Sequence, residues 1–229
     1  MKSRKTIDLA VVTSVWGDYG KYLPAWAECL AAQQLRPTET AINDAGVTDK
    51  AALAQAVKTL QDNNIPITVV RKRFWSIGKA RNQAVQATNT EWVIHLDADD
   101  VLLPHAISDV AEIADQADVV SLGAIRNGVA QVFPGITAEQ ILNRKHGMFS
   151  CGAFRRTFWE RRPWHTKNVA VDSVFWVGLA HLGARFASTG RVGFIYVQHD
   201  DSVSHSLTPQ QRKHAVRQWV NACDRWTLN

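Results

Sequence analysis

The sequence predicts an α/β fold with a mostly parallel central sheet flanked by helices and an antiparallel addition. Short apolar, β-branched runs alternate with amphipathic runs through the first hundred residues. One such run passes directly into an acidic cluster, and a later Asn-Gly pair marks a hairpin. With 229 residues, 46% of them hydrophobic and 21% charged, the chain is long enough to bury a core unaided. We expect one domain over residues 1–229.

The first part of the chain has the pattern of successive βαβ units. The apolar residues of 23–31 recur at the spacing of one helix face. The alanine-rich residues 50–60 suit a second helix, and Ser76 suits the N-cap of a third. We expect strands at 7–13, 38–42, 66–71 and 91–96, and helices at 23–31, 50–60 and 77–87.

The second part has a less regular pattern. A helix of about three turns is expected from Pro104. The pair Asn127-Gly128 predicts a hairpin, whereas residues 145–167 lack periodicity and are expected to form a loop. The remaining expected elements are a strand at 118–123, a helix from Val171, strands at 185–188 and 193–197, and a helix at 209–226.

The number and spacing of the cysteines and the lengths of the apolar runs exclude several classes of protein. The three cysteines, at positions 29, 151 and 223, are widely spaced and form no CxxC, which argues against a disulfide scaffold and a zinc ribbon. Asp8 interrupts the apolar stretch near the N-terminus, and no run of about 18 apolar residues follows. We therefore expect a cytoplasmic protein without a transmembrane segment.

The net charge of +5 is unevenly distributed along the chain. Residues 1–143 carry 13 Lys and Arg against 16 Asp and Glu, a balance of −3. Residues 144–229 carry 13 against 5, a balance of +8. This asymmetry indicates either an anionic partner for the second part or only a solubilising surface.

The acidic cluster Asp97-Ala98-Asp99-Asp100 directly follows the strand expected at 91–96. Parallel sheets bind ligands at the carboxyl edge of their strands. Three carboxylates repel one another there unless a cation neutralises them, and a hard divalent cation shared with substrate phosphates does so. The alternative is a solvated turn in which Asp99 or Asp100 caps the helix that begins near Pro104.

Several segments stand in the order and spacing of one family's landmarks: VVTSVWGDY with LPAWAECLAAQ, TAINDAG, ITVVRKRFWSIGKARNQAVQATNTEWVIHLDADD, and YVQHDDSVSHS. Together they resemble the family 2-like glycosyltransferases of the GT-A fold. The resemblance is dense over 7–104, thin over 105–170 and partly regained over 171–206. It implies a nucleotide-sugar-binding part at 1–104 and an acceptor-binding and catalytic part at 105–229. It also implies a nucleotide-diphosphate sugar as donor, with a UDP-sugar expected first, and a divalent cation, Mn²⁺ or Mg²⁺.

The resemblance assigns donor-binding roles by position. Thr13 and Asp44, which end the first two strands, are implied to hold the base and ribose, although Asp44 could instead stabilise its own turn. Gly78, Arg81 and Asn82 match a Gly-x-x-Arg-Asn helix start. Gly78 would let the backbone pass close to the donor, and Arg81 would contact the diphosphate unless it is an ordinary surface arginine. Asp97 is implied on the ribose side as well.

The resemblance also implies three metal ligands and one supporting carboxylate: Asp97, Asp99, His199 and Asp100. Asp97-Ala98-Asp99 is the family's DXD motif, and His199 opens a late His-x-x-Ser-x-Ser segment. Asp200-Asp201 stands where the family often has Pro-Gly, so His205 is an alternative ligand to His199.

Asp172 is the implied general base. In the family this acid is the Asp of a Glu-Asp pair that opens a helix after the acceptor loop, and here Val171 replaces the Glu. Asp172 lies off the apolar stripe and is the only acid between Glu160 and Asp200. One base is sufficient for a single displacement, which inverts the anomeric centre. The alternative is an aspartate favoured there by the helix dipole.

The acceptor is expected at residues 144–167, which hold seven Lys and Arg and five Phe and Trp with a single Glu. Aromatic rings with arginines stack sugars, or bases and phosphates. The first reading is a glycan, a lipid-linked sugar or another hydroxyl compound. The alternatives are an anionic polymer such as DNA with a hydroxylated base, and a binding module without turnover. Since no QxxRW motif or membrane span is present, we expect a non-processive enzyme.

Overall fold

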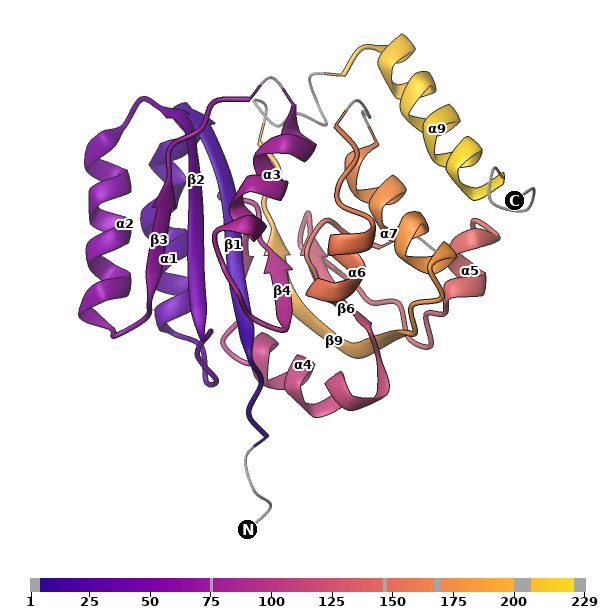
Figure 1. The fold of residues 1–229 in the computed structure, drawn as a ribbon, viewed down its shortest axis with the longest axis horizontal. Coiled ribbons are helices and arrows are strands. Elements are labelled where there is room, and N and C mark those ends of the chain that lie inside the picture. Colours follow the sequence, from indigo (N-terminus) through magenta and orange to yellow (C-terminus); the bar gives the residue numbers. More distant parts are fainter. Residues whose placement is uncertain (1–4, 75, 146–147, 167–169, 200–206, 225–229) are drawn as a thin grey trace.

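The computed structural model describes residues 5–74, 76–145, 148–166, 170–199 and 207–224, which form one sheet with helices on both faces (Figure 1). The sheet has nine strands in the order β3-β2-β1-β4-β8-β6-β9-β5, with β7 paired to β6. The strands are β1 (Leu9–Gly17), β2 (Glu39–Val47), β3 (Ile67–Val70), β4 (Trp92–His95), β5 (Val101–Leu102), β6 (Val119–Arg126), β7 (Val129–Gln131), β8 (Gly152–Arg155) and β9 (Phe186–Tyr196). The helices are α1 (Leu23–Ala31), α2 (Lys50–Asp62), α3 (Ile77–Gln86), α4 (Ala106–Ile113), α5 (Ala138–Leu142), α6 (Arg156–Arg161), α7 (Val171–His181) and α9 (Pro209–Asp224), with 3-10 helices η1 (Asp18–Tyr22) and η2 (Ala114–Gln116).

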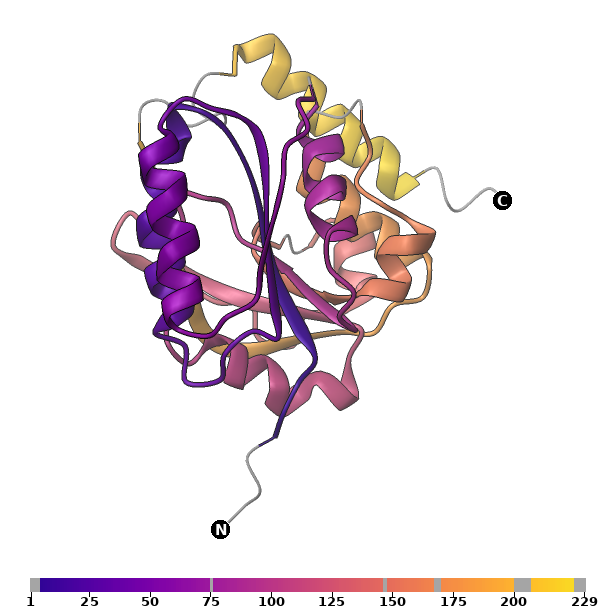
Figure 2. The same cartoon turned by 60° about the vertical axis from the view of Figure 1, so that its left-hand side comes forward.

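The first four strands form the parallel part of the sheet. Strand β1 pairs in parallel with β2 and β4, and β2 pairs in parallel with β3. Because successive side chains alternate across a strand, Val11 of β1 packs with α1, α2 and α4, and Val12 packs with α3, α6 and α7. Figure 2 shows α1 and α2 on one side of these strands and α3 on the other. This arrangement brings the carboxyl ends of β1, β2 and β4 to one edge.

The second part of the sheet contains the antiparallel addition. Strand β8 lies antiparallel to both β4 and β6, β6 is parallel to β9, and β9 is antiparallel to β5. The predicted hairpin joins β6 to β7, and Asn127 and Gly128 in its turn have φ angles of 51° and 74°. Both angles lie in the left-handed region that a two-residue type I′ turn requires. The predicted α/β fold class is therefore confirmed.

Some predicted elements differ from the structure. Residues 145–167 are not a continuous loop, because they contain β8 and α6. Strand β8 is only four residues long and is stabilised by pairing with two other strands, which local periodicity does not reveal. The two strands expected at 185–188 and 193–197 are one continuous strand, β9. Gly190 lies within it and has a φ of 67°. The short elements β5 and α5 were not predicted.

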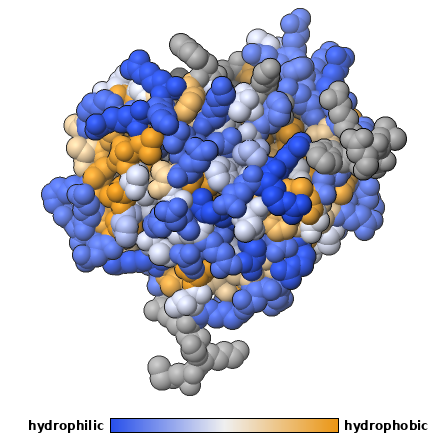
Figure 3. Space-filling model, viewed as in Figure 1, coloured by the Kyte–Doolittle hydropathy of each residue, from blue (hydrophilic) through white to orange (hydrophobic). Residues whose placement is uncertain are grey.

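Helix α9 packs on α5 and α7 at the far end of the molecule from α2 (Figure 1). Cys223 is buried there and Trp219 packs against the same cluster. Val216, which precedes Val220 by one helical turn and Cys223 by two, is nevertheless 56% exposed. Most of the face in Figure 3 is hydrophilic, with smaller hydrophobic areas between the polar side chains. In the described part of the chain, none of the helices has the length and apolar character needed to cross a bilayer.

Candidate active site

A buried arginine joins two carboxylates at the carboxyl edge of the parallel strands. Arg81 lies on α3, and its side chain is 7% exposed. It donates from Nη2 to Asp97 Oδ1 at 2.9 Å and from Nη1 to Asp172 Oδ1 in a short contact. Asp97 follows β4, whereas Asp172 lies in the first turn of α7. The structure thus brings together three predicted site residues from distant parts of the chain, and Arg81 is not a surface arginine.

The three groups set one another's protonation. Burial lowers the pKa of Arg81, but the charges of Asp172 and Asp97 outweigh it and raise that pKa above its ordinary value. Burial raises the pKa of Asp97, but Arg81 and His95 hold it below the ordinary value. For Asp172, burial raises the pKa and the negative charge of Asp97 adds to this, so that Arg81 only partly offsets the rise. A carboxylate with a raised pKa is a better proton acceptor than an ordinary one.

Trp164 and His95 pack against this cluster. The guanidinium carbon of Arg81 lies 6.0 Å from the Trp164 ring centroid, and the His95 ring meets Trp164 edge-on at 5.6 Å. Burial and, to a smaller extent, the charge of Arg81 lower the pKa of His95 to about 3, so this imidazole is neutral at pH 7. Its Nδ1 lies 3.7 Å from Asp97 Oδ1, and within the described residues neither ring nitrogen has a hydrogen-bond partner.

The other two carboxylates of the acidic cluster, Asp99 and Asp100, contact residues that directly follow β9. Asp99 Oδ2 lies 2.8 Å from His199 Nε2, and Asp100 Oδ1 accepts a hydrogen bond from the Val197 backbone N–H at 3.0 Å. Neither carboxylate caps α4, because the N-cap position of that helix is His105 without a side-chain cap. Burial and the charge of Asp97 raise the pKa values of both Asp99 and Asp100.

The predicted metal ligands are only partly gathered. Asp99 and His199 are in contact, whereas Asp97 is paired with Arg81. Over the described ranges, no group of three His, Cys, Asp or Glu side chains is arranged to hold a metal ion. Asp200, Asp201 and His205 lie outside the described residues.

The two predicted base and ribose contacts lie in neighbouring strands but not at their ends, because β1 continues to Gly17 and β2 to Val47. Thr13 of β1 is fully buried, and its hydroxyl has no partner among the described residues. Asp44 of β2 accepts hydrogen bonds from the backbone of Gly46 and Val47, at 2.9 and 2.8 Å, and from Lys50 Nζ at 2.7 Å. Burial raises the pKa of Asp44, but these three donors bring it below the ordinary value. Asp44 therefore does stabilise its own turn, and its contact with a donor stays a prediction.

Two residues of the Gly-x-x-Arg-Asn segment contact the chain before α7. A Cβ on Gly78 would lie 2.4 Å from the backbone oxygen of His165, so close packing of α3 is sufficient to require glycine here. Asn82 Oδ1 accepts hydrogen bonds from Trp159 Nε1 at 2.9 Å and from the Trp164 N–H at 3.0 Å, and its Nδ2 donates to the Trp164 oxygen at 2.9 Å. Both residues lie in the site, but their partners in this structure are protein groups.

The basic aromatic segment 144–167 is internal only in part: three of its aromatic side chains are buried, whereas Arg144, Lys145 and Arg161 are exposed. Phe154, Trp159 and Trp164 are buried in the core between the sheet and α7, so the expectation that they stack on an acceptor is wrong.

Arg155 pairs with Glu91 and Asp118. Arg156 donates to the Thr90 and Val85 oxygens and to Thr88 Oγ1. Lys167 lies outside the described residues. Arg155 and Arg156 thus hold β8 and α6 on residues 85–91 and on Asp118. A count of charges could not distinguish this role from an external one.

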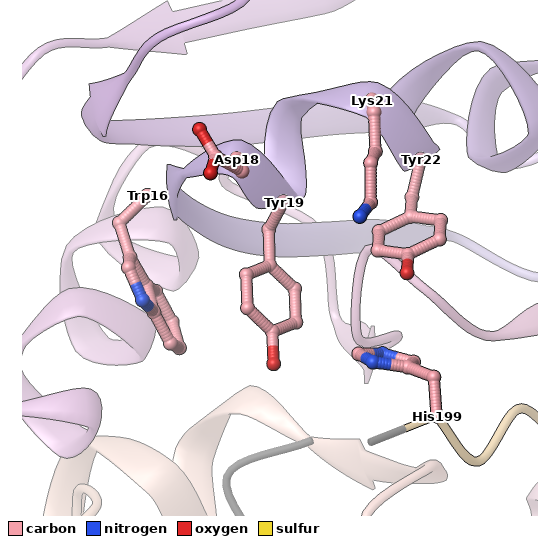
Figure 4. A pocket seen from close by; sticks show the side chains of 6 residues that line it. All are labelled: Trp16, Asp18, Tyr19, Lys21, Tyr22 and His199. Atoms are coloured by element: carbon pink, nitrogen blue, oxygen red, sulfur yellow. The ribbon is translucent and has the colours of Figure 1, made fainter. Parts of the chain in front are cut away.

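The structure contains a pocket of about 240 Å³ that sequence reasoning missed, lined by Trp16, Asp18, Tyr19, Lys21, Tyr22 and His199 (Figure 4). The His199 ring lies 5.6 Å from Tyr19 and 5.2 Å from Tyr22, between centroids. Trp16 ends β1, and both tyrosines come from η1. The spacing Trp-x-x-Tyr-x-x-Tyr directly after a strand was the available signal, since it gathers aromatic rings at the carboxyl edge.

The sequence comparison identifies one family, and the structure comparison finds proteins with a similar fold. The model of glycosyl transferase family 2 matches residues 11–175. No curated protein sequence matches the chain. Among solved structures, residues 1–349 of TarS from S. aureus in complex with UDP-GlcNAc align with a TM-score of 0.71 and 19% identity, over 88% of this chain and 62% of that one. The mannosyltransferase PcManGT from Pyrobaculum calidifontis, in complex with GDP-Man and Mn²⁺, aligns with a TM-score of 0.67 and 16% identity, over 95% and 70%.

The structural likeness concerns the fold, and the family model covers most of the chain, from β1 to the first turns of α7. The chain spans less than two thirds of the TarS fragment in complex with UDP-GlcNAc. The matched residues include Asp97, Arg81 and Asp172, which the structure brings together. The chain belongs to glycosyl transferase family 2.

Proposed function

We propose that this enzyme transfers a single sugar from a nucleotide-diphosphate sugar to an acceptor hydroxyl, with inversion and with Asp172 as the general base. Residues 1–104 bind the donor, and residues 105–229 bind the acceptor and supply the base. The known complexes of TarS with UDP and UDP-GlcNAc and of PcManGT with GDP-Man support a nucleotide-sugar donor, and a UDP-sugar is the first to test.

One observation carries the proposal: Arg81 contacts both Asp97 and Asp172. A single guanidinium group therefore bridges Asp97, the first residue of the DXD motif, and Asp172, the proposed base. This spacing supports the proposal, since an acceptor hydroxyl at Asp172 would lie beside a sugar whose diphosphate is directed toward Asp97 and Asp99. Since the Arg81 side chain is only 7% exposed, its contacts with the two carboxylates are not those of an ordinary surface ion pair.

The proposed reaction is one displacement. The acceptor hydroxyl gives its proton to Asp172 Oδ2, while Arg81 remains on Oδ1. The acceptor oxygen forms a bond to the anomeric carbon, and the bond from that carbon to the diphosphate oxygen breaks with its electron pair on the diphosphate. Arg81 also offers positive charge to the departing diphosphate. The raised pKa of Asp172 suits it to accept a proton at this step.

Asp99 and His199 offer two donor atoms to a divalent cation, which would take its remaining ligands from Asp97 and the diphosphate. Asp99 Oδ2 and His199 Nε2 lie 2.8 Å apart, and Asp100 Oδ2 is buried without a partner in the described part of the chain. We propose Asp97, Asp99 and His199 as the residues that would hold Mn²⁺ or Mg²⁺. When bound, the cation neutralises charge on the leaving diphosphate.

For the acceptor, we propose a glycan or another neutral hydroxyl compound. The excess charge of residues 144–229 suggested an anionic polymer, but Arg155, Arg156 and Arg185 bind protein groups. The pocket lined by Trp16, Tyr19 and Tyr22 offers aromatic faces to a sugar or base ring of a bound substrate.

The test is nucleoside diphosphate release from a panel of nucleotide sugars with Mn²⁺, with and without a chelator. We expect one donor to be turned over, the chelator to stop the reaction and added Mn²⁺ to restore it. Asp99→Ala should abolish the Mn²⁺ response, and Asp62→Asn is the matched control because Asp62 is an exposed acid paired only with Lys58 on α2. Undiminished turnover in the chelator would contradict the metal assignment.

A further inference from the structure

Helix α3 contacts three consecutive backbone carbonyls of the chain that precedes α7. Asn82 Nδ2 donates to the Trp164 oxygen at 2.9 Å, and Ser76 Oγ donates to the Thr166 oxygen at 2.5 Å. Between them, Gly78 leaves room for the His165 oxygen, which a Cβ would approach to 2.4 Å. Segment 164–166 therefore lies along α3, and we call these contacts the α3 clamp.

The clamp fixes Trp164, and Trp164 in turn supports α7. Asn82 holds both the N–H and the oxygen of Trp164. The indole of Trp164 stacks on Phe175 with centroids 4.1 Å apart and an angle of 18° between the rings. Phe175 lies three residues after Asp172, so both residues are in the first turns of α7. Trp164 is 1% exposed, and a buried indole in this contact has little room to shift.

We propose that Asn82 is a positioning residue for the base and not a ligand of the donor. This inference rests on the proposed role of Asp172. Through Trp164 and Phe175, Asn82 sets where the first turn of α7 meets Arg81, and it thereby fixes the separation of Asp172 from Asp97. Both lone-pair directions of Asn82 Oδ1 are occupied, by Trp159 Nε1 and the Trp164 N–H, so this oxygen has no acceptor capacity left for a substrate.

The kinetic test compares Asn82→Ala with wild type in two backgrounds. If Asn82 positions the base, kcat falls at least tenfold, while the Kd of UDP, measured by calorimetry, stays within twofold. In an Asp172→Asn background the same substitution changes kcat by less than twofold, since the base it positions is gone. A weaker Kd for UDP with unchanged kcat, or an equal loss in both backgrounds, would overturn the inference.

A second readout does not depend on turnover. Hydrogen exchange of the backbone amides at 164–166 and 171–176 should accelerate in Asn82→Ala. It should stay unchanged in Asn63→Ala, whose side chain, among the described residues, donates to the Thr59 oxygen of α2. Unchanged exchange in a folded Asn82→Ala variant would refute the clamp. If wild type turns over no donor, the proposed function fails, and the exchange comparison still decides whether the clamp exists.

Discussion

The ion-pair cluster at Arg81 gives the sharpest stability prediction. Arg81→Met keeps an unbranched side chain and removes its charge, which leaves Asp97 and Asp172 facing each other without the guanidinium between them. Breaking a buried pair costs about 3–5 kcal/mol. The two carboxylates are 30% and 26% exposed, so water can solvate them in part, and we expect the lower end, about 3 kcal/mol. For a chain of this length that lowers Tm by about 6–12 °C.

The assay is thermal and urea unfolding at pH 7.5, with Lys58→Met as the matched control. Lys58 and Asp62 form an exposed i,i+4 pair, so the control should lose about 0.3–0.5 kcal/mol. In an Asp172→Asn background, Arg81→Met should cost less by about 1–2 kcal/mol, because only one carboxylate is then left unpaired. The reasoning is refuted if Arg81→Met costs no more than the control, or if its cost is the same in both backgrounds.

Three further predictions concern other parts of the fold. Gly78→Ala should destabilise by about 1–3 kcal/mol by urea unfolding, since its Cβ would press on the His165 oxygen, and a neutral result would contradict this packing. Asn127→Val should cost about 1–2 kcal/mol because a β-branched residue disfavours a φ of 51°. Burial raises the pKa of Asp118 but hydrogen bonds from Arg185 lower it below the unfolded value, so its stabilisation is present above the unfolded pKa and lost as pH falls through the folded pKa. The difference in the free energy of unfolding between wild type and Asp118→Asn should therefore shrink from pH 7 toward pH 3. A constant difference would show that this ion pair does not contribute to the loss of stability at acid pH.

The parallel half of the fold could be predicted from the sequence, because its strands and helices are long enough to show their own periodicity. Residues 23–31 and 50–60 are helical as expected, and Ser76 caps α3 by accepting the Lys79 N–H. Strand β8 could not be predicted, since four residues carry too little pattern and its stability comes from pairing with β4 and β6.

The site shows the same division between local and distant information. The DXD motif, Arg81 and Asp172 were predicted from motif order, and the structure brings three of these side chains together. The roles of Asn82 and Trp164 depend on contacts across about 80 positions of the chain, which no local pattern reports. The charge of segment 144–167 was misleading for a similar reason, because Arg155 and Arg156 find their partners in distant elements.

The central claim is that Asp172 takes the acceptor proton beside a donor held on the Asp97 side. It is tested most directly by kcat of Asp172→Asn with the best donor and acceptor, alongside the Kd of UDP for the same variant. The account predicts that kcat falls by about 10²–10⁴-fold while the Kd of UDP changes little, because the variant removes a general base and leaves the donor contacts in place. A kcat within fivefold of wild type would show that another group is the base.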